Sequence, residues 1–250
     1  MLDILIKNGT VVDGTGSSRR LAAVGIKDGK LVLDVSLDQA SSARTIDAEG
    51  LIVAPGFIDM HSHSDTTMLE DPGGESKAHQ GVTTEVTGNC AYSPFPVSPN
   101  AGLAKSQRYG WPFSSPEWDW TDLDGWANFH EQKGISLNIA PQVGQSAIRQ
   151  AIGLNDNRPP NKDEMNRMRS LAAESVEQGA FSVSTGLTIA PSSYATTDEL
   201  VELVGAISQY EGAFYVTHAF QVEISSCFLL AFGLLHITAS NTLKAMNYDL

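Results

Sequence analysis

Residues 55–65 read PGFIDMHSHSD, and this stretch guides the interpretation of the whole chain. A short apolar, strand-like run that ends at Met60 is followed at once by His61 and His63. Alternate residues of a strand point to the same face, so two imidazoles with one residue between them form half of a metal site. The alternative is that both histidines lie on a polar loop, and the pair alone does not decide between the two.

The residues on either side of Pro55-Gly56 predict two different architectures. Between residues 2 and 54, short β-branched runs are separated by Asn-Gly, Asp-Gly and Glu-Gly pairs, which are typical of hairpin turns. After Gly56, predicted strands alternate with predicted helices, which indicates a parallel sheet in either a doubly wound or a (β/α)8 barrel fold. No GxGxxG or GxxxxGK[ST] motif follows a strand, so a nucleotide-binding fold has no support.

The alternating part contains five predicted strands and three well-defined predicted helices. The strands are expected at residues 57–60, 81–89, 137–144, 180–187 and 213–219. The helices are expected at Thr121–Lys133, at Asp163–Gln178, and after a capping box formed by Thr196 and Glu199. We therefore divide the chain into a small β domain (1–54), a partial (β/α) barrel (55–223) and an atypical tail (224–250).

The overall composition narrows the range of partners. The formal net charge is −13, which repels phosphate backbones and anionic lipid, so we expect neither nucleic acid nor membrane as a partner. The N-terminus lacks the features of a signal peptide, and the apolar stretch at 224–237 is too short to span a bilayer. Two distant cysteines make no disulfide framework. These features predict a cytoplasmic protein, and they leave the oligomeric state open.

Histidine and cysteine collect where the predicted strands end. His61 and His63 follow the first strand, Cys90 follows the second, and His218 ends the fifth. The carboxyl ends of barrel strands carry the active site of this fold, and zinc prefers histidine and cysteine ligands. The sequence therefore predicts a zinc site formed by these four residues. Asp65, just after the pair, would either orient a ligand or cap a helix.

The quoted stretch resembles the first-strand signature of the amidohydrolase superfamily, which comprises metal hydrolases on a (β/α)8 barrel. GVTTEVTGNCAYSPFP, GLTIAPSSYATTDEL and FYVTHA resemble more closely the N-acyl-D-amino-acid deacylases, or D-aminoacylases. The GNC segment is the specific part, because few amidohydrolases place a cysteine there. The fourth-strand segment FSVSTGLTIAPS lacks the lysine that usually bridges two metals, which argues against a hydantoinase or a dihydroorotase.

The resemblance implies a zinc-dependent hydrolase that deacylates N-acyl-D-amino acids, its small-molecule partners, to a carboxylate and a D-amino acid. It implies that Cys90 and His218 hold the tighter zinc with one more histidine, while His61 and His63 define a weaker position. Zinc-bound water would be the nucleophile, and an aspartate from the last strand would transfer the proton. Tyr194 is the candidate substrate-binding residue, with a packing role as the alternative.

The sequence departs from the family at several places. Ala91 stands where the family usually has glycine, and Ile189 stands where it usually has tyrosine. Residues 224–250 do not align, and the catalytic aspartate would lie beyond residue 250, so no catalytic residue is assigned. We therefore expect a chain truncated at its C-terminus, with an incomplete barrel of about five strand–helix units and a β-sandwich-like N-terminal domain.

Two alternatives to a D-aminoacylase stay open. The first is a metal-binding remnant of this fold without catalytic activity. The second is another amidohydrolase, either a deaminase or a cyclic amidase. Deaminases release ammonia and deacylases release a carboxylate, so their products distinguish them.

Overall fold

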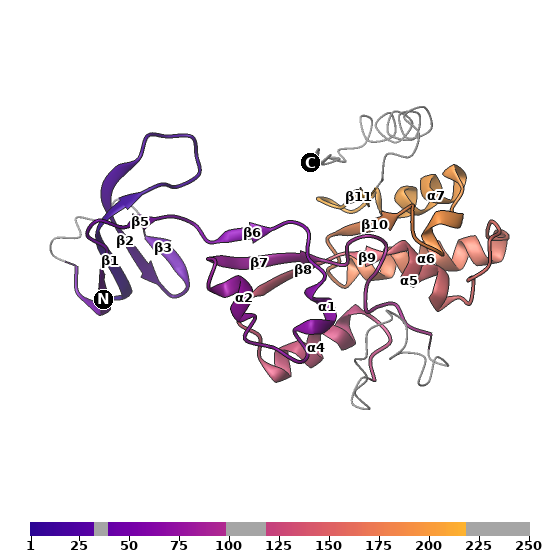
Figure 1. The fold of residues 1–250 in the computed structure, drawn as a ribbon, viewed down its shortest axis with the longest axis horizontal. Coiled ribbons are helices and arrows are strands. Elements are labelled where there is room, and N and C mark those ends of the chain that lie inside the picture. Colours follow the sequence, from indigo (N-terminus) through magenta and orange to yellow (C-terminus); the bar gives the residue numbers. More distant parts are fainter. Residues whose placement is uncertain (33–39, 99–118, 219–250) are drawn as a thin grey trace. The chain divides into compact units, whose positions relative to one another are not determined.

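A computed structural model of the protein describes residues 1–32, 40–98 and 119–218 (Figure 1). The chain separates into two compact units, Met1–Phe57 and a second unit that begins at Ile58. The predicted tail at 224–250 lies outside the described residues. Among the helices of the described ranges, none has the length and apolar character needed to cross a membrane.

The first unit is a five-stranded sheet built around its longest strand, β1 (Leu2–Val11). The sheet order is β3-β2-β1-β4, and β5 also pairs with β1. β2 is antiparallel to β1 and to β3, whereas β4 and β5 run parallel to β1. The other strands are β2 (Arg20–Lys27), β3 (Lys30–Val32), β4 (Ser42–Asp47) and β5 (Ile52–Val53).

Two of the predicted turn pairs have different outcomes. Asp28 and Gly29 join β2 to β3 with φ angles of 51° and 71°, as a two-residue hairpin turn requires, so this turn is confirmed. The turn predicted at Asn8-Gly9 is wrong, because β1 continues through it with a register shift between Ile6 and Gly9. A Cβ at Gly9 would lie 2.5 Å from Val53 Cγ2, so this glycine makes room for β5.

The second unit has its strands in chain order, and every pair with an assigned direction is parallel. The sheets are β6-β7-β8 and β9-β10-β11, and β8 and β9 are separated only by Gln142. Parallel pairing joins β7 to β8, β9 to β10 and β10 to β11, which confirms the predicted α/β architecture with a parallel sheet. The strands are β6 (Phe57–Asp59), β7 (Val82–Thr87), β8 (Asn138–Pro141), β9 (Val143–Gly144), β10 (Ser182–Gly186) and β11 (Phe214–His218).

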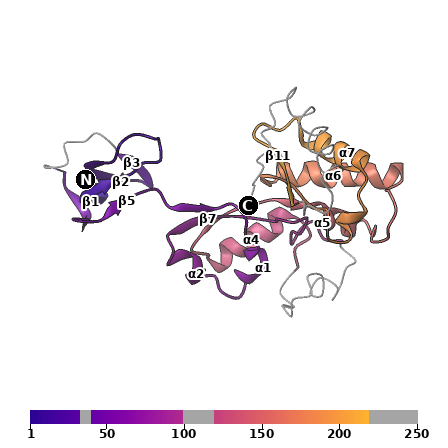
Figure 2. The same cartoon turned by 45° about the horizontal axis from the view of Figure 1, so that its top comes forward.

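Helices connect these strands and end close to the predicted residues. Asp122 accepts a hydrogen bond from Gly125 N at the start of α4, and Gly134 ends the helix with a φ angle of 77°. α6 ends just before Gly179, as predicted, and packs beside α7 (Figure 2). The helices are α1 (Ser64–Thr67), α2 (Glu75–Ala78), α4 (Leu123–Lys133), α5 (Gln145–Ala151), α6 (Lys162–Glu177) and α7 (Thr197–Ile207).

The capping box predicted at α7 is only half correct. The Thr196 hydroxyl accepts from Glu199 N, as the prediction requires. The Glu199 carboxylate does not bond back to Thr196, because it is buried and forms an ion pair with Arg149 at 2.6 Å. A complete capping box instead opens α6, between Asn161 and Glu164. A long-range ion pair has therefore replaced a local interaction at α7.

The main hydrophobic core of the second unit lies between its helices and its strands, including β9 and β10. Its buried apolar side chains come from α4 to α7 and from the strands and loops that they cover. They include Phe95, Trp126, Val143, Ile148, Met168, Val183, Leu203 and Ile207. This packing fixes the strands from one side and leaves their carboxyl ends to polar residues.

Candidate metal centre

Three of the four predicted ligands converge at the carboxyl ends of the strands. His61 follows β6, Cys90 follows β7, and His218 is the last residue of β11. Cys90 Sγ lies 3.3 Å from His61 Nε2 and 3.0 Å from His218 Nδ1. The three ligand atoms lie within 4.8 Å of one another. Parallel strands thus bring together side chains as distant in the sequence as His61 and His218.

The other candidate residues lie outside this group of three. The His63 ring is next to that of His61, with centroids 5.4 Å apart. Tyr194 is half-buried at the end of the 3₁₀ helix Ser192–Tyr194, which follows β10. His130 is buried in α4 against Trp126, and burial lowers its pKa to about 4. The structure leaves the roles of His63 and Tyr194 as predictions.

The backbone around Cys90 adopts an unusual conformation. Cys90 and Ala91 have φ angles of 56° and 70°, in the left-handed region that favours glycine. The glycine that the family usually has after the cysteine fits this conformation without strain, whereas Ala91 does not. The departure seen in the sequence therefore falls on a strained position of the metal-site loop.

Glycines on neighbouring strands leave room for this loop. A Cβ at Gly144 would lie 2.1 Å from Ala91 O, and a Cβ at Gly186 would lie 2.5 Å from Cys90 O. Real Cβ atoms do not approach backbone oxygens so closely, so only glycine fits at either position. The ends of β9 and β10 thus form a close-fitting support for the Cys90 loop.

Buried hydrogen bonds fix the same loop. The Ser184 hydroxyl accepts from Ala91 N at 3.2 Å and donates to Gly88 O. Gln142 Nε2 donates to Asn89 Oδ1 at 3.0 Å, and Asn89 Nδ2 donates to Ser62 O at 3.1 Å. These polar groups are buried, so the loss of any of these hydrogen bonds leaves a polar group without a hydrogen-bond partner and destabilises the protein.

Asp65 connects the histidine segment to the cysteine loop. Its buried carboxylate accepts a hydrogen bond from Gly88 N at 2.5 Å. α1 begins at Ser64, so Asp65 lies within the first turn and the predicted N-cap role is wrong. Burial raises the pKa of Asp65 to about 7.

The electrostatic environment favours neutral histidines beside a protonated thiol. Partial burial lowers the pKa of His61, assisted by His218, and partial burial together with His61 lowers the pKa of His63. Burial raises the pKa of the Cys90 thiol. Neutral imidazole is the metal-binding form of histidine, whereas the thiol has to lose its proton to a bound cation.

The spacing of the three ligand atoms fits a zinc ion. Bonds of about 2.3 Å to sulfur and about 2.0 Å to nitrogen give a sulfur–nitrogen separation of about 3.5 Å in a tetrahedral site. The observed separations of 3.3 Å and 3.0 Å are close to this value. One thiolate and two imidazoles form a donor set that suits zinc and leave a fourth position open for water or substrate.

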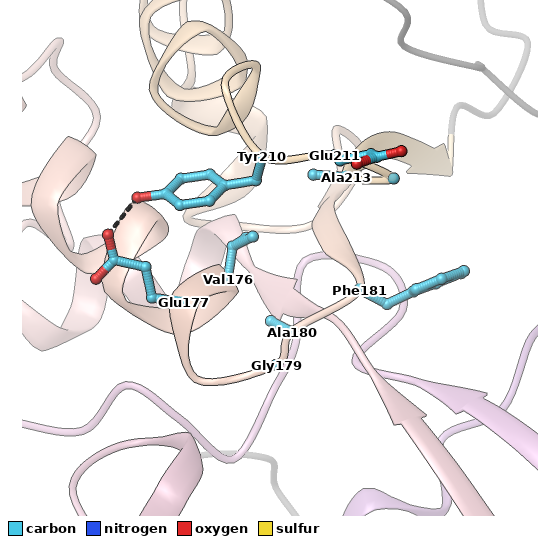
Figure 3. Close-up of a pocket in the computed structure, with 9 residues that line it drawn as sticks. Val176, Glu177, Gly179, Ala180, Phe181, Tyr210, Glu211 and Ala213 are labelled. Carbon is cyan, nitrogen blue, oxygen red and sulfur yellow. Dashed lines mark hydrogen bonds between the residues drawn. The ribbon is translucent and has the colours of Figure 1, made fainter.

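A prominent pocket of the second unit lies at the other end of the strands. It has a volume of about 500 Å³ and is lined by residues just before β10 and β11, including Phe181 and Ala213 (Figure 3). Tyr210 donates a hydrogen bond to Glu177 on its wall. None of the predicted metal ligands lines this pocket.

Comparison with protein-family models matches residues 44–223 to a family described as the amidohydrolase family. The chain belongs to this family. The match includes all four predicted metal ligands, and it confirms the resemblance inferred from the first-strand motif.

One curated relative and two solved structures define the similarity more closely. The chain is 34% identical over 217 residues to an N-acyl-D-aspartate deacylase of Alcaligenes xylosoxydans xylosoxydans, covering 86% of the chain and 43% of the relative. A crystal structure of D-aminoacylase aligns with a TM-score of 0.84 at 29% identity, over 98% of the chain and 51% of that structure.

An N-acyl-D-glutamate deacylase from Bordetella bronchiseptica, solved with zinc and a phosphonate inhibitor that mimics the tetrahedral intermediate, aligns with a TM-score of 0.82. Its identity is 29%, and the alignment covers 98% of the chain and 50% of that structure. The chain shares the α/β amidohydrolase fold of these proteins. It spans less than half the length of the curated deacylases that it matches.

Apart from Asp65, sequence reasoning missed the residues that support the ligands. The contact between Ser184 and the Cys90 loop joins positions 93 apart, and the hydrogen bond between Gln142 and Asn89 joins positions 53 apart. No local pattern predicts either contact. Only the glycine that the family usually has at position 91 hinted at the conformation of the loop.

Proposed function

We propose that the protein acts as a zinc-dependent hydrolase of linear amide bonds that deacylates N-acyl-D-amino acids to a carboxylate and a D-amino acid. The observation that carries this proposal is the cluster of His61, Cys90 and His218 at the strand ends. The similarity to deacylases of N-acyl-D-aspartate and N-acyl-D-glutamate supports the substrate class.

The proposal includes the finer architecture. The parallel strands from β7 to β11, in chain order, support a (β/α)8-type barrel. The β-sandwich-like form of the small N-terminal domain remains a prediction, because β1 to β5 form one sheet. The proposed boundaries remain 1–54 and 55–223, close to the change of compact unit after Phe57. A cytoplasmic location and the absence of nucleic-acid and membrane partners remain predictions from the charge of −13.

In this proposal His61, Cys90 and His218 hold zinc, so His61 moves from the weaker position that the family resemblance implied, and His63 belongs to a second, weaker position. Bound zinc polarises an amide carbonyl and lowers the pKa of water. The residues of the chain supply the geometry: Asp65 and Asn89 join the histidine segment to the Cys90 loop, and Ser184 holds the Cys90 loop against β10. Tyr194 remains the candidate for substrate contact, because it follows β10 on the side of the strand ends.

Metal binding without turnover is the second candidate function. It requires only the ligand cluster that the described ranges contain. Substrate assays separate the two functions. A deacylase releases a carboxylate from N-acetyl-D-amino acids, whereas a deaminase would release ammonia and a cyclic amidase would open a ring.

The first test measures zinc in the purified chain and in Cys90→Ser. We expect about one zinc per wild-type chain and a loss of affinity greater than about 100-fold in Cys90→Ser, which removes the thiolate. His79→Gln is the control, because His79 lies at the exposed end of α2. Equal zinc content in wild type and Cys90→Ser would contradict the proposed site.

Zinc binding at pH 7 should also release protons. The raised pKa keeps Cys90 protonated in the metal-free protein, while the lowered pKa values keep His61 and His63 neutral. We therefore expect release of about one proton per zinc, and an affinity that increases with pH. Calorimetry in buffers of different ionisation enthalpy measures this number, and a value near zero would exclude Cys90 as a ligand.

A further inference from the structure

A buried carboxylate lies directly behind the histidine segment. Glu85, in β7, is fully buried. Its Oε1 accepts hydrogen bonds from the hydroxyls of Ser62 at 2.9 Å and Ser64 at 3.0 Å. These serines alternate with His61 and His63 in the sequence, so one carboxylate oxygen holds the backbone segment that carries both imidazoles.

Lys77 extends this arrangement to the other side of the segment. Its ammonium group lies 3.5 Å from Glu85 Oε1 and forms a close ion pair with Asp59 Oδ2. The other oxygen of Asp59 accepts a hydrogen bond from His61 N at 3.1 Å. A buried charge is costly unless it is paired, and Lys77 provides this pairing for Glu85. Asp59 therefore holds the backbone at His61, Glu85 holds the next residue, Ser62, and Lys77 lies close to both carboxylates.

The two ligand-bearing segments bind each other reciprocally. Asp65, from the histidine segment, accepts from Gly88 N in the cysteine loop. Glu85, from the strand that leads into the cysteine loop, accepts from the hydroxyls of the histidine segment. Asn89 also donates to Ser62 O. Each segment thus presents a carboxylate to the other, and these contacts join the segments that carry His61 and Cys90, whose ligand atoms lie 3.3 Å apart.

We propose that Glu85, paired with Lys77, is a positioning residue of the metal centre: it holds Ser62 and Ser64 so that His61 meets Cys90 in ligand geometry. This inference rests on the proposed metal site and assigns its outer support. Groups that orient metal ligands through hydrogen bonds change metal affinity when they are altered, even though they do not touch the metal.

Cobalt titration of the full chain tests the proposal, because cobalt reports both affinity and ligand geometry in its absorption spectrum. We expect Glu85→Gln to bind cobalt about 10–100-fold more weakly and to change the d–d bands, while the thiolate charge-transfer band remains. Glu177→Gln is a matched control, since Glu177 also accepts from a hydroxyl, that of Tyr210, at the other end of the strands. It should bind cobalt as the wild type does.

Ser64→Ala is a milder second test in case Glu85→Gln does not fold. It removes only one half-exposed hydroxyl from the cluster. It should weaken cobalt binding several-fold with a similar spectral change. A folded Glu85→Gln or Ser64→Ala with wild-type affinity and spectrum would overturn the positioning role and leave the metal site intact. A wild-type chain that binds no cobalt and no zinc would overturn the proposed function and the positioning role together.

Discussion

The two ends of β10 and β11 differ in their chemistry. At the carboxyl ends, Gly186 supports the Cys90 loop and His218 contacts the Cys90 thiol. At the amino ends, Phe181 and Ala213 line a pocket of about 500 Å³ (Figure 3). The carboxyl end holds the candidate metal ligands, while the amino end holds this pocket.

The candidate metal centre is therefore identified by its ligand side chains and not by the volume of a pocket. Near the carboxyl end of β10, the buried Ser184 hydroxyl is hydrogen-bonded to the strained Cys90 loop. At the amino ends the charged side chains of Glu177 and Glu211 are exposed. Buried polar groups need compensation and hold a fixed geometry, whereas exposed ones are satisfied by water.

The largest loss of stability is expected at the carboxyl end, from a substitution of Gly144 that fills the space occupied by the Cys90 loop. Gly144→Ala places a Cβ 2.1 Å from Ala91 O, so it should lower the free energy of unfolding by about 3 kcal/mol and weaken zinc binding. Gly205→Ala is the control, because nothing lies near its Cβ in α7.

Chemical denaturation measures both glycine variants. Gly205→Ala should be neutral or stabilise the protein by up to about 1 kcal/mol through helix propensity. The described packing of the Cys90 loop would be refuted if Gly144→Ala unfolded at the same denaturant concentration as Gly205→Ala.

Removing one hydroxyl from each end compares the two ends directly. Ser184→Ala leaves Ala91 N and Gly88 O without their shared partner, so it should cost about 2 kcal/mol and reduce zinc affinity. Tyr210→Phe removes the hydroxyl that donates to Glu177 at the amino-end pocket. It should leave the unfolding temperature within about 1 °C of wild type.

Thermal unfolding and zinc titration of both hydroxyl variants provide the comparison. If Tyr210→Phe destabilised the protein as much as Ser184→Ala, the two ends would not differ in the way their burial indicates.

The smallest change in stability is expected at Ala91, and it tests the left-handed conformation of the Cys90 loop. Ala91→Gly should raise the free energy of unfolding by about 0.5–1 kcal/mol, because glycine adopts a φ angle of 70° without strain. Ala172→Gly, within α6, should instead destabilise by about 1 kcal/mol or more. Equal destabilisation by both substitutions would argue against a left-handed conformation at Ala91.

Features that depend on near neighbours along the chain could be predicted from the sequence. The spacing of His61 and His63, the strand–helix alternation after Gly56 and the helix ends at Gly134 and Gly179 all follow from patterns within one element. The turn at Asp28-Gly29 belongs to the same class, because two adjacent residues decide its φ angles. Such patterns also predicted that histidine and cysteine would lie at strand ends.

Which of these side chains meet depends on the packing of distant segments. Strand register brings His218 to Cys90 across 128 positions, and the left-handed Cys90 loop packs closely against Gly144 and Gly186. The same packing turned Asn8-Gly9 into part of a strand and drew Glu199 away from its predicted cap. Contacts between distant segments depend on the packing of whole elements, and local sequence patterns do not encode that packing.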